Sequence, residues 1–340
     1  MDCRDLRRRR ARARFASRCS RVVRRHLGRH RSADRGGTVK TVVFASGKGG
    51  TGKTTLTALA AAILAKNHRL VLADCDVEAS NLPIALSVTT TASESFSGGA
   101  GAFIDPIACR GCGVCLRACR FEALVRPEWD DESPAYRVNP WLCEGCGACV
   151  SRCSYHAISM QKKSAGEVFS GTSAVGPVSF GQLGPGEDLS GKLVTEVRSR
   201  AKAMAEESDA ELLLIDGPPG VGCPVIASIT NTDLLVAVTE PTLSGESDLL
   251  RLVMLARRLG VDVAVVLNKA DLSARGAERI RRRVASEGLD LLGEIPFDPT
   301  LASVLERLAS GARIETLLAE AAPGLAAAQG ALTMVVDRLA

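Results

Sequence analysis

The feature that most constrains this chain is a glycine-rich segment between an apolar run and a helix-forming stretch. Residues 41–45 (TVVFA) are apolar or β-branched, as is typical of a buried parallel strand. The residues that follow, 47–54, read GKGGTGKT and match the pattern G-x-x-x-x-G-K-[ST]. A helix is expected over residues 53–66. Strand, loop and helix in this order are the context in which this motif binds phosphate, whereas a chance glycine-rich turn would need neither neighbour.

The residues of this loop have separate expected tasks. Backbone N–H groups of the glycines would wrap the phosphates, and the helix N-terminus would add its dipole. Lys53 would reach the β- and γ-phosphates, and the Thr54 hydroxyl would bind Mg²⁺. The nucleotide-binding residues predicted here are Gly47, Gly49, Gly50, Thr51, Gly52, Lys53, Thr54 and Thr55.

Further apolar runs alternate with helix-forming stretches along the chain. Buried strands are expected at residues 70–73, 212–215, 234–238 and 264–267. Helices are expected at 248–259, at 274–287 and, with a break at Pro323-Gly324, over 299–338. This alternation predicts an α/β fold with a doubly wound, mostly parallel sheet, as in P-loop NTPases.

The loop sequence KGGTGKT, with its early Lys48, resembles the phosphate loop of the MinD/ParA/Mrp and nitrogenase-reductase class of ATPases. The resemblance implies an ATP-dependent homodimer in which Lys48 crosses to the partner's nucleotide and stabilises charge on the transferred phosphoryl group. It also implies that Asp76, after the second strand, orients the attacking water and that Asp216 holds Mg²⁺ through water. Asp74 is either a helper of Asp76 or a strand-end carboxylate.

The residues expected to bind the base are compatible with either guanine or adenine. Residues 268–271 (NKAD) look like the N-K-x-D motif of GTPases, in which the aspartate reads guanine. Related ATPases use an asparagine at this strand end to read adenine, and Lys48 marks that branch. We therefore expect ATP, with Asn268, Pro296 and Asp298 at the adenine.

Eight of the twelve cysteines form two similar runs. Cys109, Cys112, Cys115 and Cys119 follow C-x2-C-x2-C-x3-C, and Cys143, Cys146, Cys149 and Cys153 repeat the spacing 34 residues later. This pattern is that of two-cluster bacterial ferredoxins, in which the fourth cysteine of each run ligates the other cluster. It predicts two [4Fe–4S] clusters. One set is Cys109, Cys112, Cys115 and Cys153, and the other is Cys143, Cys146, Cys149 and Cys119.

Zinc is the alternative occupant, since paired C-x2-C motifs also bind zinc. A zinc site does not require a third cysteine at the same spacing after each C-x2-C pair. Glycines at 111, 113, 145 and 147 would let the backbone turn tightly around the sulfurs. The family usually has proline after the fourth cysteine, whereas Arg120 and Ser154 stand here, which puts the local turn in question.

Two polar segments rich in small residues, 87–101 and 164–191, flank the cysteines and are expected to be linkers. The resemblance to MinD-superfamily ATPases with an inserted ferredoxin domain then covers nearly all of residues 40–340. It divides the chain into a basic tail (1–39), a first ATPase part (40–90), a small α+β ferredoxin-like insert (102–160) and a second ATPase part (190–340).

Charge is concentrated in the tail. Residues 1–40 hold 15 Lys and Arg against three acids, a net of +12, whereas the whole chain carries +5, so the rest carries −7. An acidic body argues against nucleic-acid binding there. The tail is open between a basic arm, an organelle transit peptide and a stretch upstream of a true start near Val39.

The task of the protein is open between three hypotheses. The first is a cytoplasmic, ATP-gated redox protein that serves a client protein. The second is an Mrp-like carrier of iron–sulfur clusters or another metallocofactor. The third is a MinD-like positioning ATPase, which would need a basic amphipathic C-terminal helix for membrane binding that residues 330–340 do not provide. Cys223, at an expected helix start after Asp216, is either a packing residue or a redox contact at the dimer interface.

Overall fold

The computed structural model describes residues 39–126, 134–187 and 189–310 and, nearer the C-terminus, 312, 316–317, 319–320 and 322–339. The predicted basic tail, apart from its last residue, lies outside these ranges. No helix in the described ranges is both long and apolar enough to cross a membrane.

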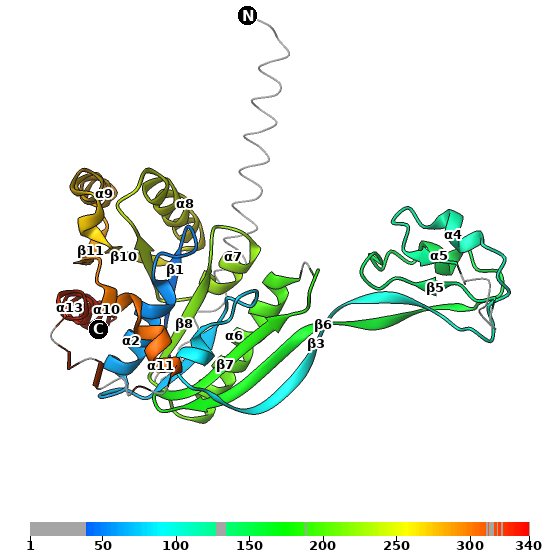
Figure 1. Ribbon diagram of the computed structural model, residues 1–340, viewed down its shortest axis with the longest axis horizontal. Coiled ribbons are helices and arrows are strands. Elements are labelled where there is room, and N and C mark those ends of the chain that lie inside the picture. Colours follow the sequence, from blue (N-terminus) through cyan, green and yellow to red (C-terminus); the bar gives the residue numbers. More distant parts are fainter. Residues whose placement is uncertain are drawn as a thin grey trace, which may run out of the picture. The chain divides into compact units, whose positions relative to one another are not determined.

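The described chain is built on one nine-stranded sheet with the order β11-β10-β9-β1-β8-β2-β7-β6-β3 (Figure 1). Neighbouring strands from β11 to β7 are parallel, whereas β6 is antiparallel to both β7 and β3. The strands are β1 (Lys40–Ser46), β2 (Leu70–Asp74), β3 (Thr89–Ile104), β6 (Ile158–Ser173), β7 (Gly176–Leu183), β8 (Leu212–Pro219), β9 (Leu234–Thr239), β10 (Asp262–Asn268) and β11 (Asp290–Ile295).

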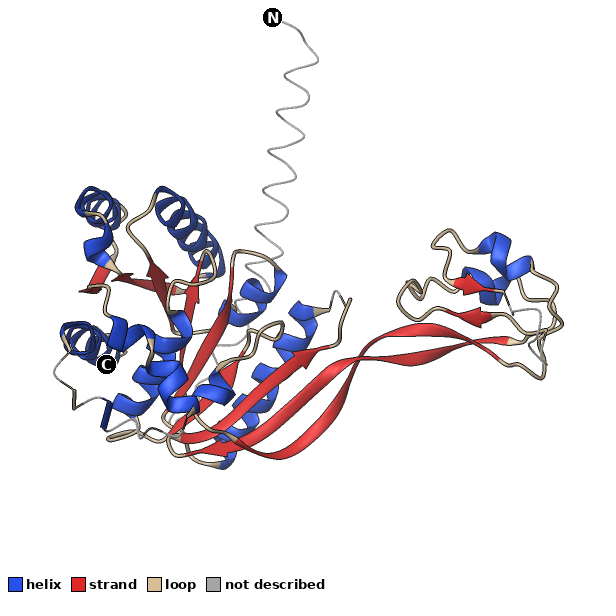
Figure 2. Cartoon of the chain, in the orientation of Figure 1, coloured by secondary structure: helices blue, strands red, loops and turns tan. Residues whose placement is uncertain are grey.

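Helices cover both faces of this sheet (Figure 2). Val42 and Phe44 of β1 belong to one apolar core, together with α2 (Lys53–Leu64) and α13 (Pro323–Asp337). Val43 and Ala45 belong to the other core, because successive side chains of a strand point to opposite faces. That second core is covered by α6 (Ser190–Glu207), α7 (Cys223–Ile229), α8 (Leu243–Leu259) and α9 (Ala274–Ser286).

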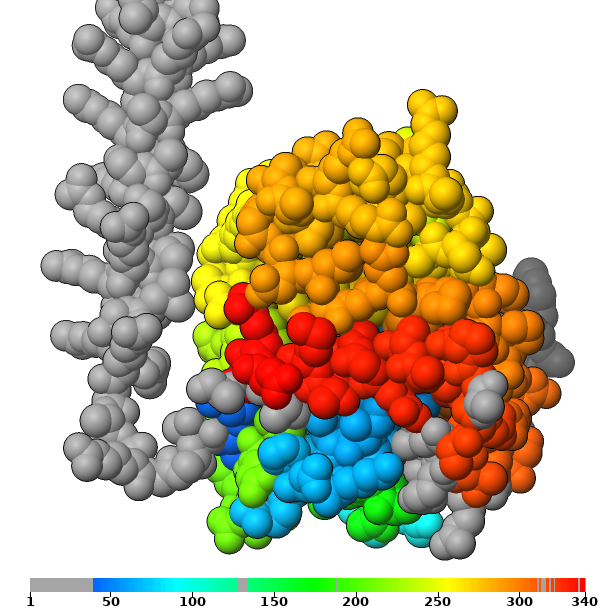
Figure 3. Space-filling view, turned by 90° about the vertical axis from the view of Figure 1, so that its left-hand side faces the viewer, coloured from blue at the N-terminus to red at the C-terminus, as the bar shows by residue number. Residues whose placement is uncertain are grey.

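The predicted strands and helices of the ATPase part are found close to their expected bounds. The helix expected over 53–66 ends at Leu64, and the one expected at 248–259 begins earlier, at Leu243. The break expected at Pro323-Gly324 is the first turn of α13, where proline needs no N–H donor. Before it lie α10 (Pro299–Ala302) and α11 (Val304–Ala309), and Figure 3 shows α13 between the β11 side and α2.

The expectation that residues 87–101 and 164–191 are linkers is wrong. Most of the first is β3, and most of the second is β6 and β7. β3 is an edge strand whose side chains are nearly all exposed or half-buried, so it needs no apolar alternation. Its Ser and Thr side chains are compatible with a strand, although their composition resembles that of a loop.

The cysteine-rich segment lies between β3 and β6. It holds two short helices, α4 (Val114–Ala118) and α5 (Ala148–Ser151), and a two-stranded sheet of β4 (Leu124–Val125) and β5 (Arg137–Val138). A small core of its own packs these elements. The two paired strands β3 and β6 continue from the main sheet to this segment without a break (Figure 2).

Candidate nucleotide site and cysteine sites

The phosphate loop joins β1 to α2 at the centre of the sheet, as expected. Gly50 and Gly52 have φ of 78° and 87°, a region that side chains strongly disfavour. A Cβ on Gly52 would lie 2.5 Å from Nδ2 of Asn268, and one on Gly47 would lie 2.1 Å from Cβ of Asp248. The loop therefore needs glycine both for its backbone path and for the elements packed against it.

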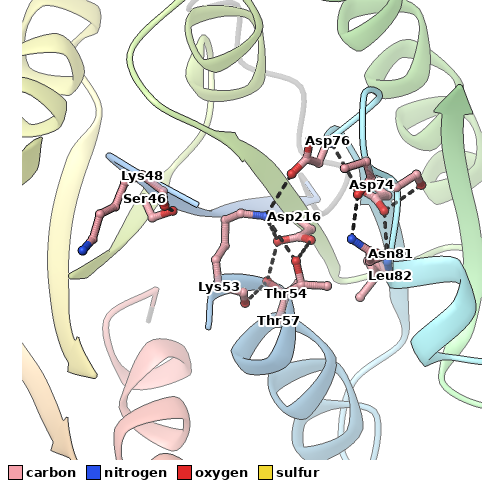
Figure 4. Close-up of polar contacts among 12 residues, drawn as sticks. Ser46, Lys48, Lys53, Thr54, Thr57, Asp74, Asp76, Asn81, Leu82 and Asp216 are labelled. Atoms are coloured by element: carbon pink, nitrogen blue, oxygen red, sulfur yellow. Dashed lines mark hydrogen bonds and ion pairs between the residues drawn. The ribbon is translucent and has the colours of Figure 1, made fainter. Parts of the chain in front are cut away.

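Asp216, in the second half of β8 (Leu212–Pro219), is the centre of the polar site (Figure 4). Its buried carboxylate accepts hydrogen bonds from Lys53 Nζ at 2.7 Å, from Thr54 Oγ1 at 2.7 Å and from Thr57 Oγ1 at 3.1 Å. Burial lowers the pKa of the Lys53 amine, but the charge and hydrogen bond of Asp216 leave that pKa raised overall. The structure thus brings together Lys53 and Thr54 of the loop and the Asp216 carboxylate of β8.

Asp74 and Asp76 differ in their surroundings. Asp74 is fully buried and accepts hydrogen bonds from Ser80 Oγ and from the backbone N–H groups of Asp76 and Leu82. Burial and the charge of Asp216 raise its pKa to about 7. These bonds make Asp74 the anchor of the loop after β2, which favours the strand-end reading over a helper role.

Asp76 faces the nucleotide cavity. Its carboxylate is 19% exposed and lies 4.0 Å from Lys53 Nζ. Burial raises its pKa, and the charge of Lys53 opposes that rise. Of the two carboxylates, Asp76 is therefore the one that can meet a water molecule beside the phosphates.

Lys48 points away from this cluster, toward the other side of the loop (Figure 4). Its Nζ lies 2.7 Å from Oε2 of Glu240, at the end of β9, while Lys269 Nζ lies 2.6 Å from Oε1 of the same carboxylate. These contacts hold the pKa of Glu240 low against the opposing effect of its burial. The sequence analysis missed Glu240, whose only signal was its place at a strand end, where ligands gather in parallel sheets.

A cavity of about 570 Å³ opens beside the phosphate loop. Its lining joins loop residues, Asp76 and Asn268 to Pro296, Phe297, Asp298 and Leu301. Thr51 Oγ1 is buried there without a hydrogen-bond partner among the described residues, as a donor awaiting a phosphate oxygen would be. The cavity thus combines a phosphate end with a more apolar end suited to a base.

The side chains at the base end are already partly engaged. Asn268 donates from Nδ2 to the Thr51 carbonyl and accepts from the Lys269 N–H, so it supports the loop. Asp298 accepts backbone N–H bonds from Thr300 and Gly324, so its carboxylate caps α10 and fixes the start of α13. Asp271 accepts the Phe297 N–H at 2.6 Å. An aspartate held in this way has one oxygen committed to the chain and not to guanine.

The eight clustered cysteines line two separate pockets. One is lined by Cys109, Cys112, Cys115 and Cys153, and the other by Cys119, Cys143, Cys146 and Cys149. Gly111, Gly113, Gly145 and Gly147 all have positive φ, between 64° and 72°. Within the described residues, no group of three or more His, Cys, Asp or Glu side chains lies close enough to hold a single metal ion.

A parallel core sheet with this loop between its first strand and helix, and Asp216 on the neighbouring strand, defines a P-loop nucleotide-binding protein. A family model described as the CobQ/CobB/MinD/ParA nucleotide binding domain matches residues 42–310. The chain belongs to this family and is a P-loop ATPase of the MinD/ParA type.

Similar proteins include two sequences and one solved structure from archaea. The Methanocaldococcus jannaschii protein MJ0578 is 34% identical over 238 residues, covering 70% of this chain and 80% of that one. MJ0579 of the same organism is 30% identical over 242 residues, covering 68% and 81%. The septum site-determining protein MinD of Pyrococcus horikoshii, solved with Mg-ADP, has a TM-score of 0.51 at 17% identity, covering 88% of this chain and 96% of that one.

The contact of Asp271 with the Phe297 N–H leads to a test of base choice. We expect Asp271→Ala to leave the ratio of ATP to GTP affinity within about threefold, because the side chain supports the chain at residue 297. Fluorescence titration with labelled ATP and GTP measures both affinities. A selective loss of GTP affinity of about tenfold or more would instead mean that Asp271 reads guanine.

Proposed function

We propose that this ATPase is an iron–sulfur protein, a nucleotide-gated homodimer that couples ATP turnover to electron transfer through two [4Fe–4S] clusters. The observation that carries the proposal is the composition of the two cysteine pockets. Each is lined by three cysteines of one run and the fourth of the other, which is the crossed ligand set of two-cluster ferredoxins.

The residues around the pockets fit such clusters. Backbone N–H groups of Ala102 and Ala157 point at the sulfurs of Cys143 and Cys153, both at 3.4 Å. Hydrogen bonds of this kind tune cluster potentials. A Cβ on Gly145 would lie 2.1 Å from the Ala100 carbonyl oxygen, so a side chain there would displace the turn that carries Cys143 and Cys146. When bound, the clusters would supply one-electron chemistry between a reduced donor protein and an acceptor protein.

The ATPase half of the proposal uses the contacts around Asp216. The Asp216 carboxylate and Lys53 Nζ form an ion pair at 2.7 Å. With Mg·ATP, Lys53 would turn to the β- and γ-phosphates, and Thr54 and Asp216 would serve the Mg²⁺, Asp216 through water. Asp76 would orient the water that attacks the γ-phosphate, and ATP and water would leave as ADP and phosphate.

The dimer in this proposal is supported by the direction of Lys48. Its side chain is one-third exposed and directed away from Lys53, so it does not serve the nucleotide of its own chain in this geometry. In a dimer it would leave Glu240 and reach the partner's nucleotide. The partners proposed are therefore a second copy and a redox protein, in the reducing cytoplasm where unpaired cysteines persist, without nucleic acid or stable membrane attachment.

A cluster or metallocofactor carrier is the second candidate. One cysteine of each pocket, Cys112 and Cys146, is exposed, so each cluster would present an edge to a client. An exposed edge serves transfer of a cluster as well as transfer of an electron. Incubation with an apo-ferredoxin separates the two, because a carrier loses iron to the acceptor and a redox protein keeps it.

The crossed ligand sets predict the iron content. The anaerobically purified protein should hold about eight iron atoms, and Cys153→Ala and Cys119→Ala should each lose about four of them, from different clusters. Iron analysis with EPR of the reduced protein measures both. Cys223→Ser is the control and should keep all eight. Stoichiometric zinc with negligible iron would contradict the assignment.

The geometry of Asp76 predicts a separation of binding from hydrolysis. Asp76→Ala should lower the hydrolysis rate by about 100-fold or more, since a positioned proton acceptor is lost, while ATP affinity stays within about threefold. Asp262→Ala, at an exposed position at the start of β10 and outside the cavity lining, is the matched control and should hydrolyse ATP at nearly the normal rate. Hydrolysis that survives in Asp76→Ala would assign the water to another group.

A further inference from the structure

We propose that helix α6 and the described residues of the loop before it, 184–187 and 189, transmit nucleotide-dependent movement to the two strands that carry the cysteine insert. The movement would start in two switch segments, residues 74–81 at the end of β2 and residues 217–229 after Asp216. The purpose of this connection rests on the proposed function, although its existence can be tested without any client. α6 packs against α7 after Asp216 and also contacts β2, β7, β6 and β3. It is therefore in contact with both switch segments and both strands of the insert.

The first contact of α6 with the switches is Arg198. Its Nη1 donates to the carbonyl of Ala227 near the end of α7. Burial raises the pKa of the Cys75 thiol, which stands between Asp74 and Asp76 in the sequence, and the charge of Arg198 is the main effect that opposes this rise. Arg198 Nε is buried without a partner among the described residues, and none of their carboxylates pairs with this guanidinium. A charge held in this way depends on where α7 places its carbonyl.

The second contact with the switches is at the start of α6. A Cβ on Gly191 would lie 3.2 Å from Cβ of Cys223, the first residue of α7. The two helix starts therefore pack closely, with the glycine backbone against the cysteine. If α7 moved after loss of the γ-phosphate, it would displace α6 through the contact of Cys223 with Gly191 and through the hydrogen bond of Arg198.

At the other side, α6 and its loop hold both insert-bearing strands. Arg200 forms an ion pair with Glu94 of β3, and Lys163 of β6 lies 2.6 Å from Glu187 of the loop. Glu187 is only 11% exposed, so this pair is less screened by solvent than a surface pair would be. The side chain of Leu189 occupies the space over Gly98, where a Cβ would lie 2.0 Å from its Cδ1.

These contacts form one route. Gly98 and Lys163 lie on the insert side of the Phe96–Gly166 pair in the ladder of β3 and β6. A continuous helix that is bonded to α7 at one point and to both strands at others can pass a displacement between them. Movement of the Ala227 carbonyl would shift Arg198, and α6 would carry the shift to Glu94 and Lys163.

Hydrogen–deuterium exchange of the full-length, anaerobically purified protein tests this route. Exchange is compared with and without a non-hydrolysable Mg·ATP analogue, in α7 and in residues 97–104 and 158–165. The normal protein should respond in both places. The variant Arg200→Met with Lys163→Met should keep the response in α7 and lose that of the strands by about fivefold or more, the lower end of coupling between linked sites.

Two controls sharpen the result. Lys202→Met with Lys162→Met removes the same charge from α6 and β6 at exposed positions and should behave as the normal protein does. Exchanging the charges, with Glu94→Arg and Arg200→Glu, should keep the response of the strands. A double Met variant whose strands respond normally, or a normal protein that responds in α7 alone, would overturn the route.

The failure of this inference can be told from that of the proposed function. If neither α7 nor the strands respond to the analogue, the nucleotide switch itself is refuted, and the route with it. Iron analysis of the same samples decides the cluster proposal independently, since the exchange response does not require iron.

Discussion

The buried carboxylate of Asp216 is the interaction on which the rest of the structure depends. It joins β8 to the phosphate loop and the start of α2 through Lys53, Thr54 and Thr57. Removing one member of a buried, hydrogen-bonded ion pair typically costs about 3–5 kcal/mol, because the other charge is left unpaired. The pair therefore holds β8 and the phosphate loop together, and the same two groups are those expected to contact phosphate and Mg²⁺.

The sheet shows how the cysteine segment is joined to the domain that carries this site. β7, β6 and β3 extend the parallel sheet beyond β2, and two of these strands continue to the cysteine segment. Strand order places β7 next to β2, whose end carries Asp74 and Asp76. The insert is thus joined to the edge of the sheet on the side of β2 and the switch segment that contains Asp74 and Asp76. α6 packs against β7, β6 and β3 at this edge.

Much of this arrangement follows from sequence because it is local. The phosphate loop, the buried strands and the cysteine spacing each lie within a few residues and need no tertiary information. The strands β3 and β6 could not be found in that way. The edge strand β3 is almost free of buried side chains and β6 has only a few, so neither needs a regular apolar alternation. The linkers expected in their place are the clearest error.

Long-range contacts were equally hidden. Glu240 forms ion pairs with both Lys48 and Lys269, and Arg198 donates a hydrogen bond to the Ala227 carbonyl. These contacts join residues far apart in sequence, and no sequence motif contains them. Asp271 shows the opposite case, in which a familiar motif is present and the structure gives its aspartate a different partner. In each case the physical reason is the fold, which decides what a side chain meets.

In the proposed function, the nucleotide site and the cysteine insert act on one another. Potentiometric titration followed by EPR, with Mg·ATP analogue and with Mg·ADP, tests it most directly. Linkage is reciprocal: if the redox state of the clusters changes the affinity for nucleotide, then bound nucleotide must change the reduction potential of the clusters. We expect two four-iron signals and a shift of about 30 mV or more, roughly a threefold change in affinity ratio for a one-electron couple. Potentials that are the same with either nucleotide, or the absence of four-iron signals, would contradict the account.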